Sequence, residues 1–275
     1  VARVPGPKGG AASNKTNPPG PPLYMELNSL QPVVVADGLG KRFGDVIAVD
    51  CISFQVRPGE TVALLGGNGA GKTTTMAMLL GLLTPSSGQV RIFDADMVHD
   101  RHKALARMNF SSPYVDLPRR LTPRENLTVY GHLYGVRGVA ARVDTLVQDM
   151  DMGAFVDRPM STLSAGQDTR VALAKALINS PEVLLLDEPT ASLDPETGDR
   201  IRGYLEGYRA ETQAAIVLAS HNMVEVERIC DRVLMLRHGK VVDSGSPSAL
   251  ISKYGRETLE EVFLHIARDG EVMDA

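Results

Sequence analysis

The sequence contains little cysteine: Cys51 and Cys230 are the only two in 275 residues. They lie far apart, and no CxxC pair or Cys/His cluster accompanies them, so the spacing typical of a zinc site is absent. The expectation for such a pair is two buried, reduced thiols in a cytosolic protein.

An excess of positive charge and long apolar runs are also lacking. The net charge of −4 and the pI of about 5.9 argue against a protein that lies along nucleic acid, because neutralising phosphates requires a basic surface. No segment approaches the roughly 20 apolar residues of a membrane helix. No secretory signal pattern opens the sequence. If the protein serves a membrane, we expect another chain to supply the spanning helices.

Proline, glycine and small polar residues dominate the start of the chain, over residues 1–22. Such a composition cannot bury a core, so residues 1–30 are predicted to form a disordered tail. Met25 falls within this tail, and a start of the native protein at Met25 is an open alternative.

Short β-rich stretches alternate with helical patterns along the rest of the chain. The expected strands cover residues 33–35, 47–56, 61–65, 89–93, 183–186, 215–219, 233–236 and 241–243. The expected helices cover residues 73–83, 165–179, 196–210, 222–230 and 257–268. Residues 112–163 show only helical patterns, at 123–134 and 140–150, and are predicted to be a helical insertion. This alternation is typical of an α/β fold with a parallel sheet.

A glycine-rich loop follows the apolar stretch at 61–65 and precedes a helical pattern. Its residues fit G-x-x-x-x-G-K-[ST] and are Gly66, Gly67, Asn68, Gly69, Ala70, Gly71, Lys72 and Thr73. Glycines let successive amides turn inward around a phosphate, and the helix start favours an anion. The Lys72 ammonium is expected to reach the β- and γ-phosphates, and the Thr73 hydroxyl to bind Mg²⁺.

Two acids end the apolar strand expected at 183–186. Carboxyl ends of parallel strands form the ligand crevice, so Asp187 is expected to hold Mg²⁺ and Glu188 to activate the attacking water. Two further features are ambiguous. Ser164 and Gln167 form either an ordinary helix-capping box or a second anion site, and His221 after the strand at 215–219 is either structural or catalytic.

Taken together, these residues resemble the nucleotide-binding subunit of the ATP-binding cassette (ABC) transporter family over roughly residues 33–246. Residues 163–167 are similar to its signature, residues 191–194 to its D-loop, and His221 to its switch histidine. Phe43 resembles the aromatic that stacks on adenine, although a core aromatic is the alternative. Residues 259–264 are similar to the drug and polysaccharide exporter branch.

The resemblance implies an α/β fold: a P-loop NTPase (RecA-like) core with an N-terminal antiparallel β subdomain and a helical insertion. The ATPase domain is then expected at 31–246, its insertion at about 112–164 and a C-terminal helical extension at 247–275. The implied cofactors are ATP and Mg²⁺, with metal contacts from Thr73 and Asp187 and catalysis by Glu188 and His221. The implied ATP contacts are Phe43, Gly66, Gly67, Asn68, Gly69, Ala70, Gly71, Lys72, Thr73 and Thr74.

In this family two subunits meet head to tail, and the signature of one covers the ATP of the other. Ser164, Gly166 and Gln167 are therefore expected to contact the γ-phosphate bound by a partner subunit. The implied partners are a membrane permease and a second ATPase subunit, with a homodimer expected and no nucleic acid. The implied location is cytoplasmic, peripheral on the inner face of the cell membrane.

The sequence departs from the family at three places. The glutamine expected at the entry to the insertion is missing, and Ser111 or Ser112 is a candidate substitute. Gly67 replaces a proline or serine and should loosen the loop. Asp168 follows the signature, where it suits the helix dipole, and is expected to point away from the triphosphate and to slow closure mildly. Nearby, Arg119, Arg120 and Arg124 form either a solvated face or a docking site for the permease.

The function expected is an ATPase that powers export through a separate permease. An importer subunit is the first alternative, and the short stretch after residue 243 favours export because many sugar importers carry a further β-domain there. A soluble non-transport ABC protein and a regulator that does not hydrolyse ATP are the others. The acidic balance opposes the former, and the presence of Glu188 and His221 opposes the latter.

Overall fold

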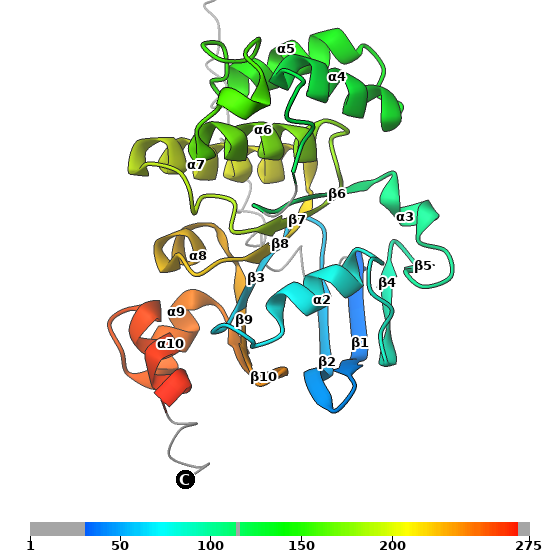
Figure 1. Ribbon diagram of the computed structural model, residues 1–275. Coiled ribbons are helices and arrows are strands. Elements are labelled where there is room, and N and C mark those ends of the chain that lie inside the picture. The colour runs from blue at the N-terminus through cyan, green and yellow to red at the C-terminus, as the bar shows by residue number, and fades with distance from the viewer. Residues whose placement is uncertain (1–30, 114–115, 269–275) are drawn as a thin grey trace, which may run out of the picture.

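Two β-sheets organise residues 31–113 and 116–268, the part of the chain that the computed structural model describes (Figure 1). A four-stranded antiparallel sheet has the order β2-β1-β4-β5, and a six-stranded sheet has the order β10-β9-β3-β8-β7-β6. In the larger sheet all neighbours are parallel except the edge strand β10, which runs antiparallel to β9. This mixed α/β architecture confirms the predicted P-loop NTPase fold class.

The strands are β1 (Val34–Phe43), β2 (Val46–Val56), β3 (Thr61–Leu65), β4 (Ser87–Ile92), β5 (Ala95–Asp96), β6 (Met108–Ser111), β7 (Val183–Asp187), β8 (Ala215–Ala219), β9 (Arg232–Arg237) and β10 (Lys240–Gly245). The helices are α2 (Lys72–Leu79), α3 (His102–Leu105), α4 (Pro123–Leu133), α5 (Val139–Asp149), the 3₁₀ turn η1 (Met160–Thr162), α6 (Ala165–Leu177), α7 (Pro195–Thr212), α8 (Met223–Ile229), α9 (Pro247–Tyr254) and α10 (Leu259–Arg268).

The central strands are buried on both faces, which explains their unbroken apolar runs. Successive side chains point to opposite faces, so Ala63 and Leu65 of β3 join one core while Val62 and Leu64 join the other. The first core lies under α6, α7 and α8 and continues into the insertion. The second lies between the large sheet, α2 and the antiparallel sheet. The large sheet therefore lies between two packed cores.

Capping residues set where most helices begin. Thr122 caps α4 in a full capping box with Glu125, and Pro123 occupies the first turn, where it loses no hydrogen bond. Asp194 caps α7 and Asn222 caps α8 through side-chain oxygens that accept the backbone N–H groups of Thr197 and Glu225. Helix α2 differs because its cap is Gly71, which offers no side-chain acceptor to the first amides.

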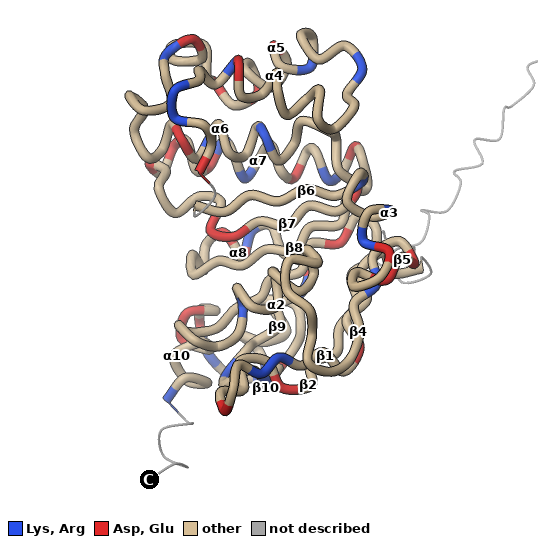
Figure 2. Tube along the Cα trace, turned by 45° about the vertical axis from the view of Figure 1, so that its right-hand side comes forward, with Lys and Arg blue, Asp and Glu red and all other residues tan. Residues whose placement is uncertain are grey.

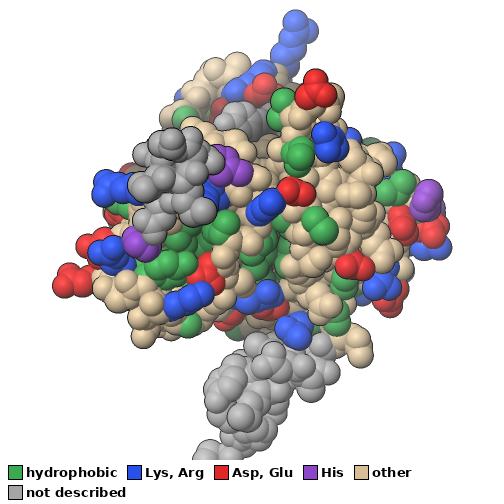
Figure 3. Space-filling model, turned by 90° about the horizontal axis from the view of Figure 1, so that it is seen from below, with side chains coloured by type: hydrophobic (Ala, Val, Ile, Leu, Met, Phe, Trp, Pro, Cys, Tyr) green, Lys and Arg blue, Asp and Glu red, His purple; other side chains and the backbone are tan. Residues whose placement is uncertain are grey.

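The helices α4 and α5 form a separate layer beyond α6 and α7 (Figures 1 and 2). On the face seen in Figure 3, basic and acidic side chains are interspersed rather than gathered into a basic stripe. No helix within residues 31–113 and 116–268 is long and apolar enough to cross a membrane.

Most expected elements occur close to their predicted positions, but several boundaries and small elements differ. Strand β1 runs from Val34 to Phe43, well beyond the expected 33–35. Pairing with both β2 and β4 stabilises the strand conformation of its glycines and polar residues. β5, β6, α3 and α9 were not expected from the sequence. Cys51 is exposed, so the expectation of two buried thiols was wrong for that residue, while Cys230 is buried. The predicted tail at 1–30 lies outside the described residues, and the domain boundaries stay a prediction.

Candidate active site

The phosphate loop leaves β3 and enters α2 with an open surface on one side. Gly66 is packed so tightly that an added Cβ would lie 2.5 Å from the carbonyl oxygen of Leu236. Gly71 has φ +101° and would place a Cβ 2.6 Å from the carbonyl oxygen of Ala48, so only glycine suits both positions. Gly67 and Gly69, in contrast, face open space, as an added Cβ there would meet no atom within 4 Å.

Lys72 opens α2 and lies within the electrostatic reach of two carboxylates. Its Nζ donates to the carbonyl oxygens of Gly66, at 2.5 Å, and Gly67, at 3.2 Å. Burial lowers the pKa of Lys72, and the charges of Glu188 and Asp187 partly offset that effect. The structure therefore brings the loop cation and both predicted acids together at the carboxyl edge of β3 and β7.

Asp187 is the last residue of β7 and is buried. Burial raises the pKa of its carboxyl, and the neighbouring charge of Glu188 raises it further. Ser112 Oγ donates to Asp187 Oδ2 across 3.4 Å, which lowers that pKa in part. Of the two candidate substitutes for the missing glutamine, Ser112 is thus the one beside the metal-ligand candidate, while Ser111 lies within β6.

Glu188 and His221 meet at the ends of neighbouring strands. His221 Nδ1 lies 2.7 Å from Glu188 Oε1, and the backbone N–H of His221 donates to Glu188 Oε2 across 3.4 Å. Glu188 has φ +51°, a conformation that is costly for a residue with a side chain and that concentrates at functional sites. Its own N–H donates to the carbonyl of Ala219, 2.8 Å away, so pairing with β8 holds this conformation.

The signature residues begin α6 as a complete capping box. The N–H of Gln167 donates to Ser164 Oγ across 3.3 Å, and the N–H of Ser164 donates to Gln167 Oε1 across 3.0 Å. The capping alternative is therefore confirmed within this chain, and a second-site role remains a prediction. Gly166 has a local reason as well, because a Cβ there would lie 3.0 Å from the carbonyl oxygen of Ser192 in the predicted D-loop.

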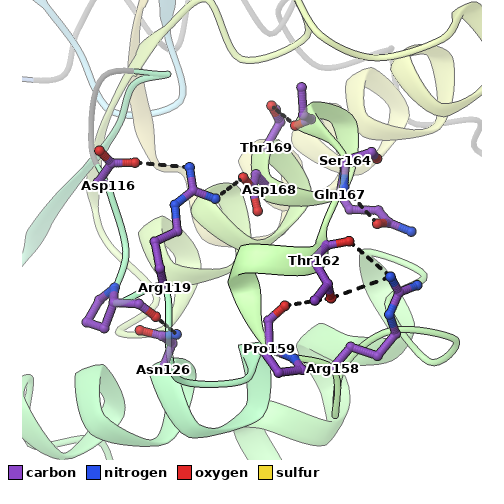
Figure 4. A network of polar contacts seen from close by, with 12 residues as sticks. Asp116, Arg119, Asn126, Arg158, Pro159, Thr162, Ser164, Gln167, Asp168 and Thr169 are labelled. Atoms are coloured by element: carbon purple, nitrogen blue, oxygen red, sulfur yellow. Dashed lines mark hydrogen bonds and ion pairs between the residues drawn. The ribbon is translucent and has the colours of Figure 1, made fainter.

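The basic cluster beside the insertion is largely neutralised by acids of the same chain. Figure 4 shows Arg119 between Asp116 and Asp168, where its Nη2 and Nη1 lie 3.2 and 2.5 Å from the carboxylate oxygens. Arg124 pairs with acids at two further positions, Asp144 and Asp157. Two of the three arginines of the basic cluster, Arg119 and Arg124, are thus paired with acids of the same chain. This pairing favours a solvated surface over a basic docking face.

Phe43 ends β1 with half of its surface, 51%, exposed. That exposure rules out the core-aromatic alternative. Lys41 Nζ lies 5.2 Å from the ring centroid, so the ring already takes part in a cation–π contact. An exposed ring face on a β-strand end is suited to stacking on a planar base.

The phosphate loop and the start of α2 fit the phosphates of a nucleoside triphosphate. The first amides of an α-helix have no partner inside the helix, and α2 lacks a capping side chain, so its start is open to an anion. Gly67, Asn68 and Gly69 are exposed beside it and leave room for phosphate oxygens.

A magnesium ion fits the same edge in a different way. No group of three or more His, Cys, Asp or Glu side chains in the described part of the chain could hold a metal alone. Mg²⁺ commonly takes one or two carboxylates and completes its shell with phosphate oxygens and water. Asp187 and the hydroxyl of Thr73, an exposed residue, match that mode of binding.

Comparison with known proteins gives one consistent family. A family model described as ABC transporter matches residues 49–191. Two relatives, each called "Nod factor export ATP-binding protein I", come from Paraburkholderia xenovorans and Ralstonia nicotianae. They are 38% and 35% identical, and the alignments cover 82% and 86% of this chain and 74% and 72% of theirs.

Solved structures agree with the fold. One described as the ATP-binding subunit of an ABC transporter superposes with a TM-score of 0.79 at 24% identity, covering 86% of this chain and 99% of the other. The family model covers more than half of the 275 residues, and the relatives share more than 30% identity over most of their length. The chain therefore belongs to the ABC transporter family and is an ATP-binding ATPase subunit.

Proposed function

We propose that this chain powers export of a substrate through a separate membrane permease, by closing on a second ATPase subunit each time ATP binds. The relatives named as export ATP-binding proteins support the direction of transport. The location that goes with this role is the cytoplasmic face of the cell membrane, held there by the permease.

The observation that carries the catalytic part is the convergence of Lys72, Asp187, Glu188 and His221 at the carboxyl ends of the parallel strands β3, β7 and β8. Lys72 would neutralise charge on the β- and γ-phosphates, and Thr73 and Asp187 would hold Mg²⁺. Glu188 would take the proton of the attacking water as its general base, while His221 orients the Glu188 carboxylate. ATP bound with Mg²⁺ supplies the cleavable phosphoanhydride.

The head-to-tail arrangement gives a role to the signature residues, which take no part in the site formed by a single chain. Within the described residues, Ser164, Gly166 and Gln167 make no hydrogen bond to the phosphate loop, and their helix α6 packs on the opposite face of the sheet from α2. A second copy could place its signature over this phosphate loop, so that ATP lies between the two chains. Hydrolysis then removes the γ-phosphate that links them, and the dimer opens.

Hydrolysis is tested by phosphate release from the purified full-length chain with Mg-ATP. We expect Glu188→Gln to lower kcat by about 100-fold or more while ATP affinity is retained. The same variant should form an ATP-dependent dimer in light scattering, because closure is no longer followed by hydrolysis. Unchanged phosphate release by Glu188→Gln would remove the general-base assignment.

The shared site is tested by mixing two inactive variants. Lys72→Ala removes the phosphate-loop cation, and Ser164→Arg blocks the signature, so each homodimer should be inactive. A mixed dimer contains one site with an intact loop and an intact signature, and the mixture should regain part of the activity. If the mixture stays as inactive as its components, although light scattering shows mixed dimers, the head-to-tail arrangement is wrong.

A further inference from the structure

A buried carboxylate lies directly behind the Glu188–His221 pair. Glu225, in the first turn of α8, is 0% exposed. Its Oε1 accepts a hydrogen bond from Thr190 Oγ1 across 3.0 Å, and its Oε2 accepts one from Ser220 Oγ across 2.6 Å. Both oxygens of this carboxyl are therefore engaged by hydroxyls from two different loops.

Those loops are the ones that carry the reacting pair. Thr190 stands two residues after Glu188 at the end of β7, and Ser220 immediately precedes His221 at the end of β8. Ser220 Oγ also accepts from the N–H of Asn222, 3.1 Å away, which fixes the other side of the turn around His221. One side chain thus ties together the two turns whose relative position sets the Glu188–His221 distance.

The carboxyl is costly at this position, which argues against a simple space-filling role. Burial raises the pKa of Glu225, and the hydrogen bonds from Ser220 and Thr190, together with the charge of the largely buried Arg202, offset this only in part. An apolar side chain of similar volume is often no less stabilising than a buried charge. What a carboxylate provides, and an apolar group does not, is a pair of acceptors at a set spacing.

A second feature explains why the turn needs support. Glu188 has the left-handed conformation, φ +51°, which persists only where the surroundings over-determine it. The hydrogen bond from its N–H to Ala219 holds one side of the residue, and the Thr190–Glu225 contact holds the segment that follows. Loss of either contact should let the turn relax.

We propose that Glu225 is a positioning residue for ATP hydrolysis, which accepts hydrogen bonds from Thr190 and Ser220 and thereby holds the Glu188 carboxylate against His221. This inference rests on the roles proposed above for Glu188 and His221. Glu225 touches no nucleotide atom in this scheme. Its removal should slow the chemical step while leaving ATP binding intact.

The first test is Glu225→Gln in the full-length protein, assayed by steady-state phosphate release and by binding of a fluorescent ATP analogue. We expect kcat to fall by about 10- to 100-fold, as small displacements of catalytic groups do, with KM and Kd within about twofold. Glu227→Gln is the matched control. It lies on the same helix but bonds to the N–H of Leu259, so its kcat should not change.

The second test removes one hydroxyl and is less able to disturb folding. Thr190→Val keeps the shape of the side chain but donates nothing to Glu225, and should lower kcat as Glu225→Gln does. Thr190→Ser keeps the hydroxyl and should restore the rate. Equal rates for the Val and Ser variants would overturn the proposal even if Glu225→Gln failed to fold.

The third test asks whether Glu225 acts through His221. If it does, the loss in kcat from His221→Ala should be smaller in the Glu225→Gln background than in the unmodified protein. Losses that simply multiply would overturn the proposal. A different result contradicts the proposed function, namely that Glu188→Gln itself still hydrolyses ATP. Inactive Glu188→Gln together with a fully active Glu225→Gln rejects only the positioning role.

Discussion

Arg119 Nη1 lies 2.5 Å from Asp168 Oδ2, joining the segment that follows β6 to the first turn of α6. The signature helix therefore starts with an acid whose charge is already paired inside the chain (Figure 4). The side chain faces Arg119, and the mild slowing of closure expected from Asp168 stays a prediction. The pairing also gives a reason for an acid where the family usually has a basic or neutral residue.

Reversing the charge at Asp168 should destabilise the start of α6. Asp168→Arg places two guanidinium groups together, whereas Asp168→Ala loses only a partly exposed pair worth at most about 1 kcal/mol. The double variant Arg119→Asp/Asp168→Arg should recover part of the loss, because the attraction between positions 119 and 168 returns with its sign reversed while the new carboxylate at position 119 also faces Asp116. Urea unfolding of the three variants measures the coupling. A double variant no more stable than Asp168→Arg would show that the pair contributes nothing.

The two neighbouring glycines of the phosphate loop should respond in opposite ways. Gly66→Ala drives a Cβ to within 2.5 Å of the Leu236 carbonyl and should abolish ATP binding through distortion of the loop. Gly67→Ala enters open space and should stabilise the nucleotide-free protein by about 0.4–1 kcal/mol, by restricting the unfolded chain. Thermal unfolding and ATP titration separate the outcomes. Equal ATP affinity in both variants would contradict the assigned packing.

Phe43 should matter for nucleotide affinity and little for stability. Loss of a base-stacking ring costs about 1–3 kcal/mol, so Phe43→Ala should weaken ATP binding by about 5- to 150-fold. The half-exposed ring contributes little to the core, and the unfolding midpoint should stay nearly unchanged. Phe43→Tyr keeps the ring and serves as the control. Binding by the Ala variant that matches the Tyr variant would remove Phe43 from the site.

Lys175 should give the protein a distinctive alkaline stability profile. Burial lowers its pKa to about 8, and its Nζ donates to Asn109 Oδ1 and to the Phe110 carbonyl, 3.1 and 3.3 Å away. The folded state therefore releases this proton before the unfolded state does. The cost of the buried charge is fully present below about pH 8 and is relieved between that pH and the unfolded pKa near 10.4.

Lys175→Met removes that titration, so the gap in unfolding free energy between variant and unmodified protein should change by about 2–3 kcal/mol from pH 7 to pH 10.5. The change should favour the unmodified protein as the pH rises. Urea unfolding at a series of pH values measures it. Parallel pH profiles of the two proteins would mean that the lysine titrates in the folded state as it does in water.

Some parts of this protein could be predicted from its sequence because they depend on local rules. The glycine spacing between a strand and a helix predicts the phosphate loop. The apolar run before Asp187 and Glu188 predicts a strand buried on both faces, with the two acids at its end. The capping box at Ser164 is equally local. Strand β6 was not predicted, because its short stretch acquires a strand conformation only by pairing with β7.

Tertiary structure alone decided which of these residues meet. Parallel pairing of β6 with β7 brings Ser112 to Asp187, and parallel pairing of β7 with β8 brings His221 to Glu188. These strands are far apart in the chain, so no local pattern encodes the contacts. The same holds for Glu225, whose sequence position is that of an ordinary acid at a helix start. It contacts both Thr190 and Ser220 only because β7 and β8 lie side by side. Local propensity sets the elements, and the burial of the sheet between two cores sets the distances between them.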